Sequence, residues 1–248
     1  MTRQYHHVRA IILKKRPWRE ADYRVTLYTE TNGKIEAIAK GARNITSSFS
    51  GHLETLNIGF FQIYESPQRL TILQCQTEKN FKNIRKNLQS SLLSLTFVEI
   101  LEKSTSKDEG KTIFNLIEKT LEELDKSEAS LLIMESFKLK LMALLGVLPE
   151  VTRCSLCHTQ WQRETTVWLH KEGYMSCQNC KQELRGETFA IEFKFIKLLH
   201  FLLHQDIGKK RLILSPIEQN QLTNISHLFL SNYLNQEIIG EKLLNFAT

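Results

Sequence analysis

The sequence predicts an α+β protein of several domains, in which a small closed β-barrel precedes an all-α domain that carries an inserted module with four cysteines. Three observations support this prediction. Apolar and polar residues alternate in short segments near the N-terminus, apolar residues then recur at three- and four-residue spacing, and two cysteine pairs interrupt the second pattern. We place the barrel at residues 1–79, the helical domain at 80–152 and 187–248, and the module at 153–186.

Five short strands are expected in the barrel. The first begins at Val8, and residues 23–30 and 34–40 alternate in polarity on either side of Asn32-Gly33, which predicts a two-residue hairpin turn. Residues 58–65 and 69–76 form a second predicted hairpin. Five strands of this length favour a small closed barrel, of which the OB-fold is the nucleic-acid-binding example.

Two loops of the barrel are expected between these strands. The segment 15–22 should join the first two strands, and the segment "KGARNITSSF" should leave the third, with Ile45 and Phe49 as its core candidates. Cys75 falls in an apolar strand, which predicts a core position.

Helices are expected over residues 87–103, 110–126, 128–146, 189–205 and 217–234. Ser215 and Glu218 predict a capping box at the start of the last helix, with Pro216 at its first position. The motif "HFLLH" spaces His200 and His204 like a metal pair, but it lacks the glutamate of a metalloprotease, so we expect partly buried structural histidines. The basic run 209–211 is expected to be a solvated helix end.

The cysteine spacing carries the strongest chemical signal. Cys154 and Cys157 are separated from Cys177 and Cys180 by nineteen residues, which is a zinc-site pattern. Four thiolates fill a tetrahedral zinc ion, so we expect one structural Zn²⁺ and no open position for catalysis. A disulfide framework is the alternative, and His158 or His170 could replace a cysteine as a ligand.

The positive charge is concentrated at the N-terminal end. Residues 1–50 contain ten Lys and Arg against four Asp and Glu, a surplus equal to the net charge of +6 of the whole chain. This asymmetry indicates an anionic partner, either nucleic acid or an acidic protein surface, although a basic face can also serve solubility alone. The apolar runs are too short to cross a membrane, and no secretory signal is recognisable, so we expect a cytoplasmic, nucleoid-associated protein.

The two barrel loops supply groups suited to DNA. Lys40 and Arg43 offer charge to phosphates, Gly41 permits close backbone approach, and Lys34 shares a strand face with Lys40. Trp18 lies between Arg16 and Arg19 and could stack on an unpaired base, or instead pack under its loop. The predicted DNA-binding residues are Arg16, Trp18, Arg19, Lys34, Lys40 and Arg43.

These features together resemble the RecO recombination mediators of bacteria. The resemblance rests on the opening strands that lead into "KGARN" and on the helix "FKLKLMALLGVLPEVTRCSLC" that leads into the cysteines. It implies an N-terminal OB-fold, a helical domain and a zinc module. The sequence departs from the family at Asn44 and Ser48, where basic residues are common, and this should weaken phosphate binding.

The resemblance also implies partners and a role in DNA repair. It implies binding to single- and double-stranded DNA, annealing of complementary strands, and contact with RecR and with the acidic tail of single-stranded DNA-binding protein. RecA would then load at gaps, as an indirect partner.

Two other classes of function are open from the residues alone. One is a zinc-stabilised adaptor whose basic face binds acidic protein tails, and the other is a zinc nuclease. The sequence lacks a P-loop, a dinucleotide fingerprint and a nucleophile elbow, so we expect no enzyme.

Overall fold

The structure of the protein is a computed structural model that describes residues 4–86, 88–105, 110–126, 131–163, 165–183, 186–205 and 212–240. The basic run 209–211 lies outside these residues. The chain divides into two compact units, Met1–Ala129 with Ile239–Thr248 and Ser130–Ile238. The first unit thus contains the strands of the barrel and two helices, whereas the second contains the cysteine cluster and the remaining helices.

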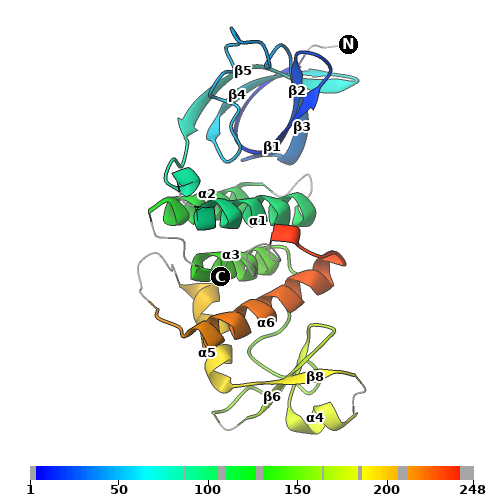
Figure 1. The fold of residues 1–248 in the computed structure, drawn as a ribbon. Helices are drawn as coiled ribbons and strands as arrows, with labels where there is room; N and C mark the ends of the chain where they lie inside the picture. Colours follow the sequence, from blue (N-terminus) through cyan, green and yellow to red (C-terminus); the bar gives the residue numbers. More distant parts are fainter. Residues whose placement is uncertain are drawn as a thin grey trace. The chain divides into compact units, whose positions relative to one another are not determined.

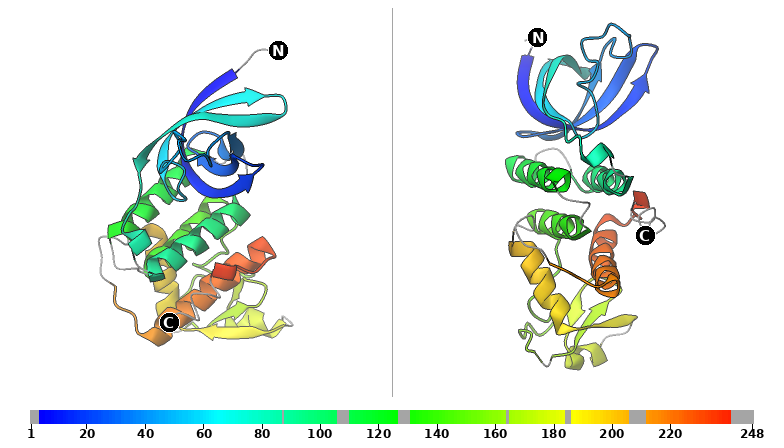
Figure 2. Two further views of the ribbon diagram at one scale, coloured as in Figure 1. Left: turned by 45° about the horizontal axis from the view of Figure 1, so that its top comes forward. Right: turned by 60° about the vertical axis from the view of Figure 1, so that its left-hand side comes forward.

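Five strands form a closed barrel in the first unit (Figures 1 and 2). They are β1 (Gln4–Trp18), β2 (Asp22–Thr29), β3 (Gly33–Ala39), β4 (Ile58–Ser66) and β5 (Arg69–Lys79). The order around the barrel is β1-β2-β3-β5-β4, and β4 pairs with β1 to close it. Among these pairs only β3 and β5 are parallel, and β5 lies between β3 and β4, so the segment that joins β3 to β4 must pass β5 at one end of the barrel.

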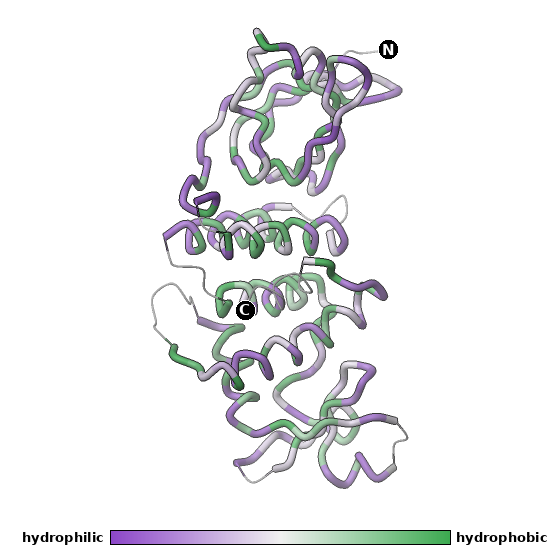
Figure 3. Tube along the Cα trace, viewed as in Figure 1, coloured by the Kyte–Doolittle hydropathy of each residue, from purple (hydrophilic) through white to green (hydrophobic). Residues whose placement is uncertain are grey.

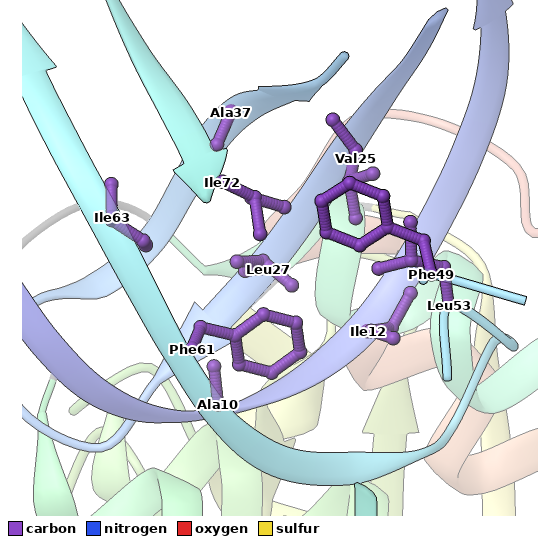
Figure 4. Close-up of a cluster of buried hydrophobic side chains, with 11 residues drawn as sticks. Ala10, Ile12, Val25, Leu27, Ala37, Phe49, Leu53, Phe61, Ile63 and Ile72 are labelled. Carbon is purple, nitrogen blue, oxygen red and sulfur yellow. The ribbon is translucent and has the colours of Figure 1, made fainter. Parts of the chain in front are cut away.

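The interior of the barrel is filled by alternate side chains of its strands (Figure 4). Phe61 and Ile63 of β4 point inward, and Phe49 and Leu53 of the segment after β3 join the same core. Phe49 therefore confirms its predicted core position, and Cys75 is partly buried against this cluster. Ile45 contradicts its prediction, because its side chain is fully exposed.

Both predicted turns of the first three strands differ in detail from the structure. The β2–β3 turn has three residues, Glu30–Asn32, because Thr29 pairs with Gly33 rather than with a later residue. The Thr29 hydroxyl closes it, donating to the Gly33 carbonyl at 3.0 Å and accepting from the Asn32 amide at 2.9 Å. The predicted loop 15–22 is mostly strand, since β1 continues to Trp18, and only Arg19–Ala21 form the turn.

Two helices lie next to each other beside the barrel within the first unit: α1 (Leu88–Ser104) and α2 (Lys111–Lys126) (Figures 1 and 2). Helix α1 contacts the outside of β1 and β3, where Lys14 Nζ donates to Glu102 Oε2 at 3.0 Å. Thr26 and Tyr28, on the outer face of β2, are also buried, although simple alternation predicts them to be exposed.

A charged network joins the barrel to α2. The Arg9 guanidinium donates to both carboxylate oxygens of Glu118 and to Glu78, while Lys79 Nζ lies 2.7 Å from Glu118. The Glu118 side chain is only 15% exposed, so these ion pairs are partly shielded from water. The hydrogen bond from Arg9 is the main cause that lowers the pKa of Glu118 from 4.5 to about 2.

Stability of the first unit should therefore depend on pH. A carboxyl group whose pKa is lowered by folding stabilises the fold above its unfolded pKa, and loses this contribution as pH falls from 4.5 towards 2. We expect Glu118→Gln to lower the free energy of unfolding by about 2–3 kcal/mol at pH 7, and the difference from wild type to shrink between pH 4.5 and pH 2. Urea denaturation at pH 7, 4 and 2 measures this. The control Glu54→Gln removes only an exposed pair with Lys15 and should cost under about 1 kcal/mol; equal losses for both variants at pH 7 would contradict the prediction.

The second unit combines three helices with a small sheet. Helix α3 (Leu131–Leu144) packs against α5 (Phe193–His204) and α6 (Pro216–Leu234), and in Figure 3 these helices alternate between hydrophobic and hydrophilic stretches. The capping box at Ser215 is confirmed, because the Glu218 amide donates to Ser215 Oγ and the Ser215 amide donates to Glu218 Oε2. Buried inside, Lys138 Nζ and Glu135 Oε2 form an ion pair of 2.8 Å.

The sheet of the second unit has the order β7-β6-β8, from β7 (Met175–Ser176), β6 (Val167–His170) and β8 (Thr188–Ile191). A short helix, α4 (Gln178–Glu183), follows β7. The helix predicted from residue 189 is wrong in its first part, because Phe189–Ile191 pair with β6 and α5 begins only at Phe193. Within the described residues, no helix combines the length and the apolar character that a membrane crossing requires.

Candidate functional site

The four predicted cysteines converge on one point of the second unit. Their Sγ atoms all lie within 4.8 Å of one another, and those of Cys157 and Cys177 are 3.8 Å apart. Thiolates about 2.3 Å from a tetrahedral metal ion are separated by about 3.8 Å, whereas a disulfide requires about 2.05 Å. The cluster therefore fits one metal ion, and the disulfide alternative is contradicted, because all these cysteines are free.

Local structure brings the two cysteine pairs together. The first pair closes a turn in which the His158 amide donates to the Cys154 carbonyl and the Cys154 amide donates to the Thr159 carbonyl. In the second pair, Cys177 directly precedes α4 and Cys180 lies in its first turn. The Cys177 amide lies 3.5 Å from Cys154 Sγ. Such amide contacts orient the sulfur ligands of a metal site.

The electrostatics of the cluster favour a bound cation. Hydrogen bonds with Thr159 lower the pKa of Cys157 to about 6, so one thiolate forms readily at neutral pH. Burial and the neighbouring sulfurs raise the pKa of Cys180 to about 12, so a full set of four thiolates is strongly opposed. A bound metal ion would supply the charge that deprotonates all four.

Among the described residues the cluster contains only the four cysteines, so neither His158 nor His170 belongs to it. His170 is buried on β6, and its Nε2 lies 2.7 Å from Ser176 Oγ, so it does not replace a cysteine among the described residues that could hold a metal. His200 and His204 lie on α5 with their rings stacked at 4.2 Å. Both are exposed, which corrects the prediction of partly buried histidines.

On the barrel, Arg43 joins the two predicted DNA-binding loops. Its guanidinium donates to the carbonyls of Arg19 and Glu20 at 3.2 and 3.0 Å, and its amide donates to the Ala21 carbonyl. The Gly41 amide, at a φ of 65°, donates to the Asp22 carboxylate. The start of the β3–β4 segment is therefore held against the β1–β2 turn, and this contact brings Arg43 next to Arg19.

Trp18 lies at the end of β1 on the outside of the barrel and is 36% exposed. The guanidinium of Arg24 stacks over its ring at 4.1 Å, and Arg24 pairs across the strands with Arg16. Glu36 lies 3.8 and 3.9 Å from these two arginines. Trp18 thus belongs to a cationic cluster and is not packed under a loop, and Arg24 is a member that the sequence analysis missed.

Lys40 lines a cavity of about 630 Å³ between the end of β3 and the β4–β5 hairpin. The cavity is also lined by Arg69, Tyr64 and Leu73. Within the described ranges, neither the Lys40 ammonium group nor the Arg69 guanidinium has an ion-pair partner. The sequence analysis did not name Arg69 among the DNA-binding residues. Its position directly after the Pro67-Gln68 turn, at the start of β5, could have indicated it.

Lys34 is the predicted residue that lies apart from the others. Its Nζ donates to the Glu102 carbonyl of α1 at 2.5 Å, on the helix-covered side of the barrel. The strand face that it was expected to share with Lys40 is therefore interrupted, because α1 occupies the part around Lys34.

Comparisons with known proteins agree across almost the full chain. The family model described as "Recombination protein O N terminal" matches residues 1–81, and "Recombination protein O C terminal" matches residues 85–239. The protein named DNA repair protein RecO from Dehalococcoides mccartyi is 30% identical over 224 residues, which are 88% of each chain. Its namesake from Alkaliphilus metalliredigens is 28% identical over 232 residues, 91% of this chain and 92% of the relative.

A closed five-stranded barrel with a cationic outer cluster, together with a four-cysteine cluster among helices that could hold a metal ion, defines an α+β protein with a candidate metal site. The extent of both family matches narrows this class to one family. The chain belongs to the RecO family.

Proposed function

We propose that this protein is a DNA-binding recombination mediator of the RecF repair pathway, and that its barrel is an OB-fold. The observation that carries the proposal is that Arg43 binds the β1–β2 turn through the carbonyls of Arg19 and Glu20. Beside it, Gly41, which follows Lys40, donates to Asp22, and Asp22 pairs with Trp18 across the strands, so these residues lie at one end of the barrel. Cations contact phosphates of any sequence, and an exposed indole stacks on unpaired bases. This combination suits binding without sequence preference.

The same chemistry supports annealing of complementary strands. Cations that neutralise two phosphate backbones reduce the repulsion between them, and no bond has to be made or broken. The names of the relatives support the role in DNA repair. Because the chain belongs to the RecO family, we extend the proposal to two direct partners, RecR and the acidic tail of single-stranded DNA-binding protein. Loading of RecA would be an indirect result of these contacts. We also propose that the protein acts in the cytoplasm, at the nucleoid.

We assign the metal of the cysteine cluster as one structural Zn²⁺. Four sulfur donors at tetrahedral spacing are the ligand set of structural zinc sites, and they leave no position for water or substrate. When bound, the ion would hold the two cysteine pairs together. Cys154, Cys157, Cys177 and Cys180 would be its ligands, and the proposal accordingly gives this centre no catalytic role.

The DNA proposal is tested by fluorescence anisotropy of labelled single-stranded and duplex DNA across a series of salt concentrations. The variant Lys40→Ala/Arg43→Ala should bind more weakly than wild type. If each residue neutralises one phosphate, the slope of log K against log salt should flatten by about 1.8 on duplex and about 1.4 on single strands. The single variant Lys40→Ala keeps the bonds of Arg43 to the turn and should show half of the change.

A matched control separates local contacts from net charge. Lys171→Ala/Arg153→Ala removes the same two charges from exposed positions of the second unit, and its salt slope should equal that of wild type. An unchanged slope in Lys40→Ala/Arg43→Ala would exclude these residues as phosphate contacts. If the wild-type protein bound neither form of DNA at low salt, the adaptor alternative, with acidic protein tails as ligands, would replace this proposal.

A further inference from the structure

The outer face of the barrel formed by β1, β4 and β5 presents an unusual set of side chains. Because Phe61 and Ile63 point into the core, the residues that alternate with them on β4 point outward (Figure 4). The strand register then aligns residues of β1 and β5 on either side of them. We call this surface the β4 face, and its members are Tyr5, His7, Phe60, Gln62, Tyr64 and Gln74.

Aromatic rings on the β4 face are exposed to solvent. Phe60 is 55% and Tyr5 54% exposed, and the ring of Tyr5 contacts that of Tyr64 with centroids 5.5 Å apart. Phe60 and Tyr64 are four residues apart on one strand, which corresponds to about 13 Å. Large exposed aromatic rings on a sheet are costly to leave in water, and they are the groups on which RNA-recognition sheets stack two or three bases.

Between the rings lie neutral hydrogen-bonding groups. A cavity of about 750 Å³ is lined by His7, Phe60, Gln62, Gln74 and Gln76 among others, and its lining residues in the described part of the chain include no Lys, Arg, Asp or Glu. The side-chain amides of the three glutamines make no hydrogen bond to any residue that the structure describes. Free side-chain amides suit the edges of bases rather than phosphates.

The β4 face also adjoins the basic part of the barrel. Tyr64 lines the cavity that contains Lys40 and Arg69. Two residues before it on β4, Gln62 pairs with Gln74 of β5, and both line the cavity of the three glutamines. On the other side, Arg9 stands opposite Phe60 but is bound to Glu118 and Glu78, so it does not supply a free charge.

We infer that the β4 face is a second DNA-contact surface, which binds the unpaired bases of single-stranded DNA. This inference rests on the proposed DNA-binding function. Phosphate contacts at Lys40 and Arg43 serve single strands and duplexes alike, whereas stacking on Phe60 and hydrogen bonds to the glutamines require bases that are not already paired. The β4 face therefore adds affinity for single strands that duplexes do not gain.

The test compares a single-stranded oligonucleotide with an abasic strand of equal length, which has the same phosphate charge but no bases. Phe60→Ala should lower the affinity for the base-bearing strand by about 5- to 100-fold. Its affinity for the abasic strand and for duplex, and its salt slope, should not change. Phe60→Trp should restore binding, since it restores a stacking ring.

A matched control is available at Phe189, an equally exposed phenylalanine on β8, and Phe189→Ala should bind all three ligands like wild type. If Phe60→Ala bound both the base-bearing and the abasic strand with wild-type affinity, the inference would be overturned and the face would be left to a protein partner. An equal loss on both strands would overturn it too, because it would indicate a change in the barrel. If wild type bound none of the three ligands, the proposed function itself would fail.

Discussion

Replacing Cys177 by Ser is expected to abolish stoichiometric zinc binding and to unfold the cysteine-bearing part of the second unit. Coordination of structural zinc contributes on the order of 10 kcal/mol or more to folding in small domains, and a serine hydroxyl does not form the thiolate that the ion requires. Zinc content per chain, measured after chelator treatment, should fall from one to near zero. The fluorescence of Trp161 and Trp168, which both lie in this region, should shift towards that of exposed indoles.

The appropriate control is Cys75→Ser. It makes the same chemical change at a cysteine of the barrel, far in sequence from the cluster, and should leave one zinc ion bound. The variant Cys177→Ser should also keep a folded barrel, because the barrel core contains no residue of the cysteine region. Retention of zinc with wild-type affinity in Cys177→Ser would exclude the four-cysteine site.

Replacing Gly59 by Ala is expected to destabilise the barrel by about 3 kcal/mol or more. A Cβ atom at this position would lie 2.2 Å from the Gln76 carbonyl oxygen and 3.1 Å from the Thr77 Cα. Both are backbone atoms of the neighbouring strand, so no change of side-chain rotamer relieves the overlap, and β4 and β5 would have to move apart. Urea denaturation of the variant measures the loss.

Gly51→Ala serves as the control for this substitution. Gly51 has a φ of 75°, but a Cβ there would meet no atom within 4 Å, so only the left-handed backbone conformation is penalised, by about 1–2 kcal/mol. If both variants lost the same free energy of unfolding, the close approach of β4 and β5 at Gly59 would not be a specific requirement for the stability of the barrel. Because Gly59 lies beside Phe60, Gly59→Ala should also disturb the β4 face.

Features that depend on local sequence were predicted correctly. The capping box at Ser215 needs only residues within one helical turn, and the cysteine pairs each need only one tight turn, so their chemistry is visible in the chain itself. The five strands were found from their alternation, although the turn at Glu30–Asn32 was misjudged by one residue, because the hydroxyl of Thr29 decides where it closes.

Features that depend on contacts between distant segments were missed or misplaced. Ile45 is as apolar as Phe49, yet only Phe49 reaches the core, because the path of the segment across the barrel turns one inward and leaves the other in solvent. Phe189 continues an apolar helical pattern, but strand pairing with β6 outweighs that local preference. Lys34 was expected beside Lys40, and the position of α1 separates them.

The sequence by itself determined the family, the four cysteines that could hold a metal ion, the five strands of the barrel and the basic N-terminal end, because each of these can be read from residue types along short stretches of chain. Tertiary structure alone decided which side chains act together: Arg24 over Trp18, Arg43 on the β1–β2 turn, and the rings and amides of the β4 face. The physical reason is that these sets form only when strands far apart in the chain pair in one register as the barrel closes, and a shift of one residue would turn each side chain to the opposite face.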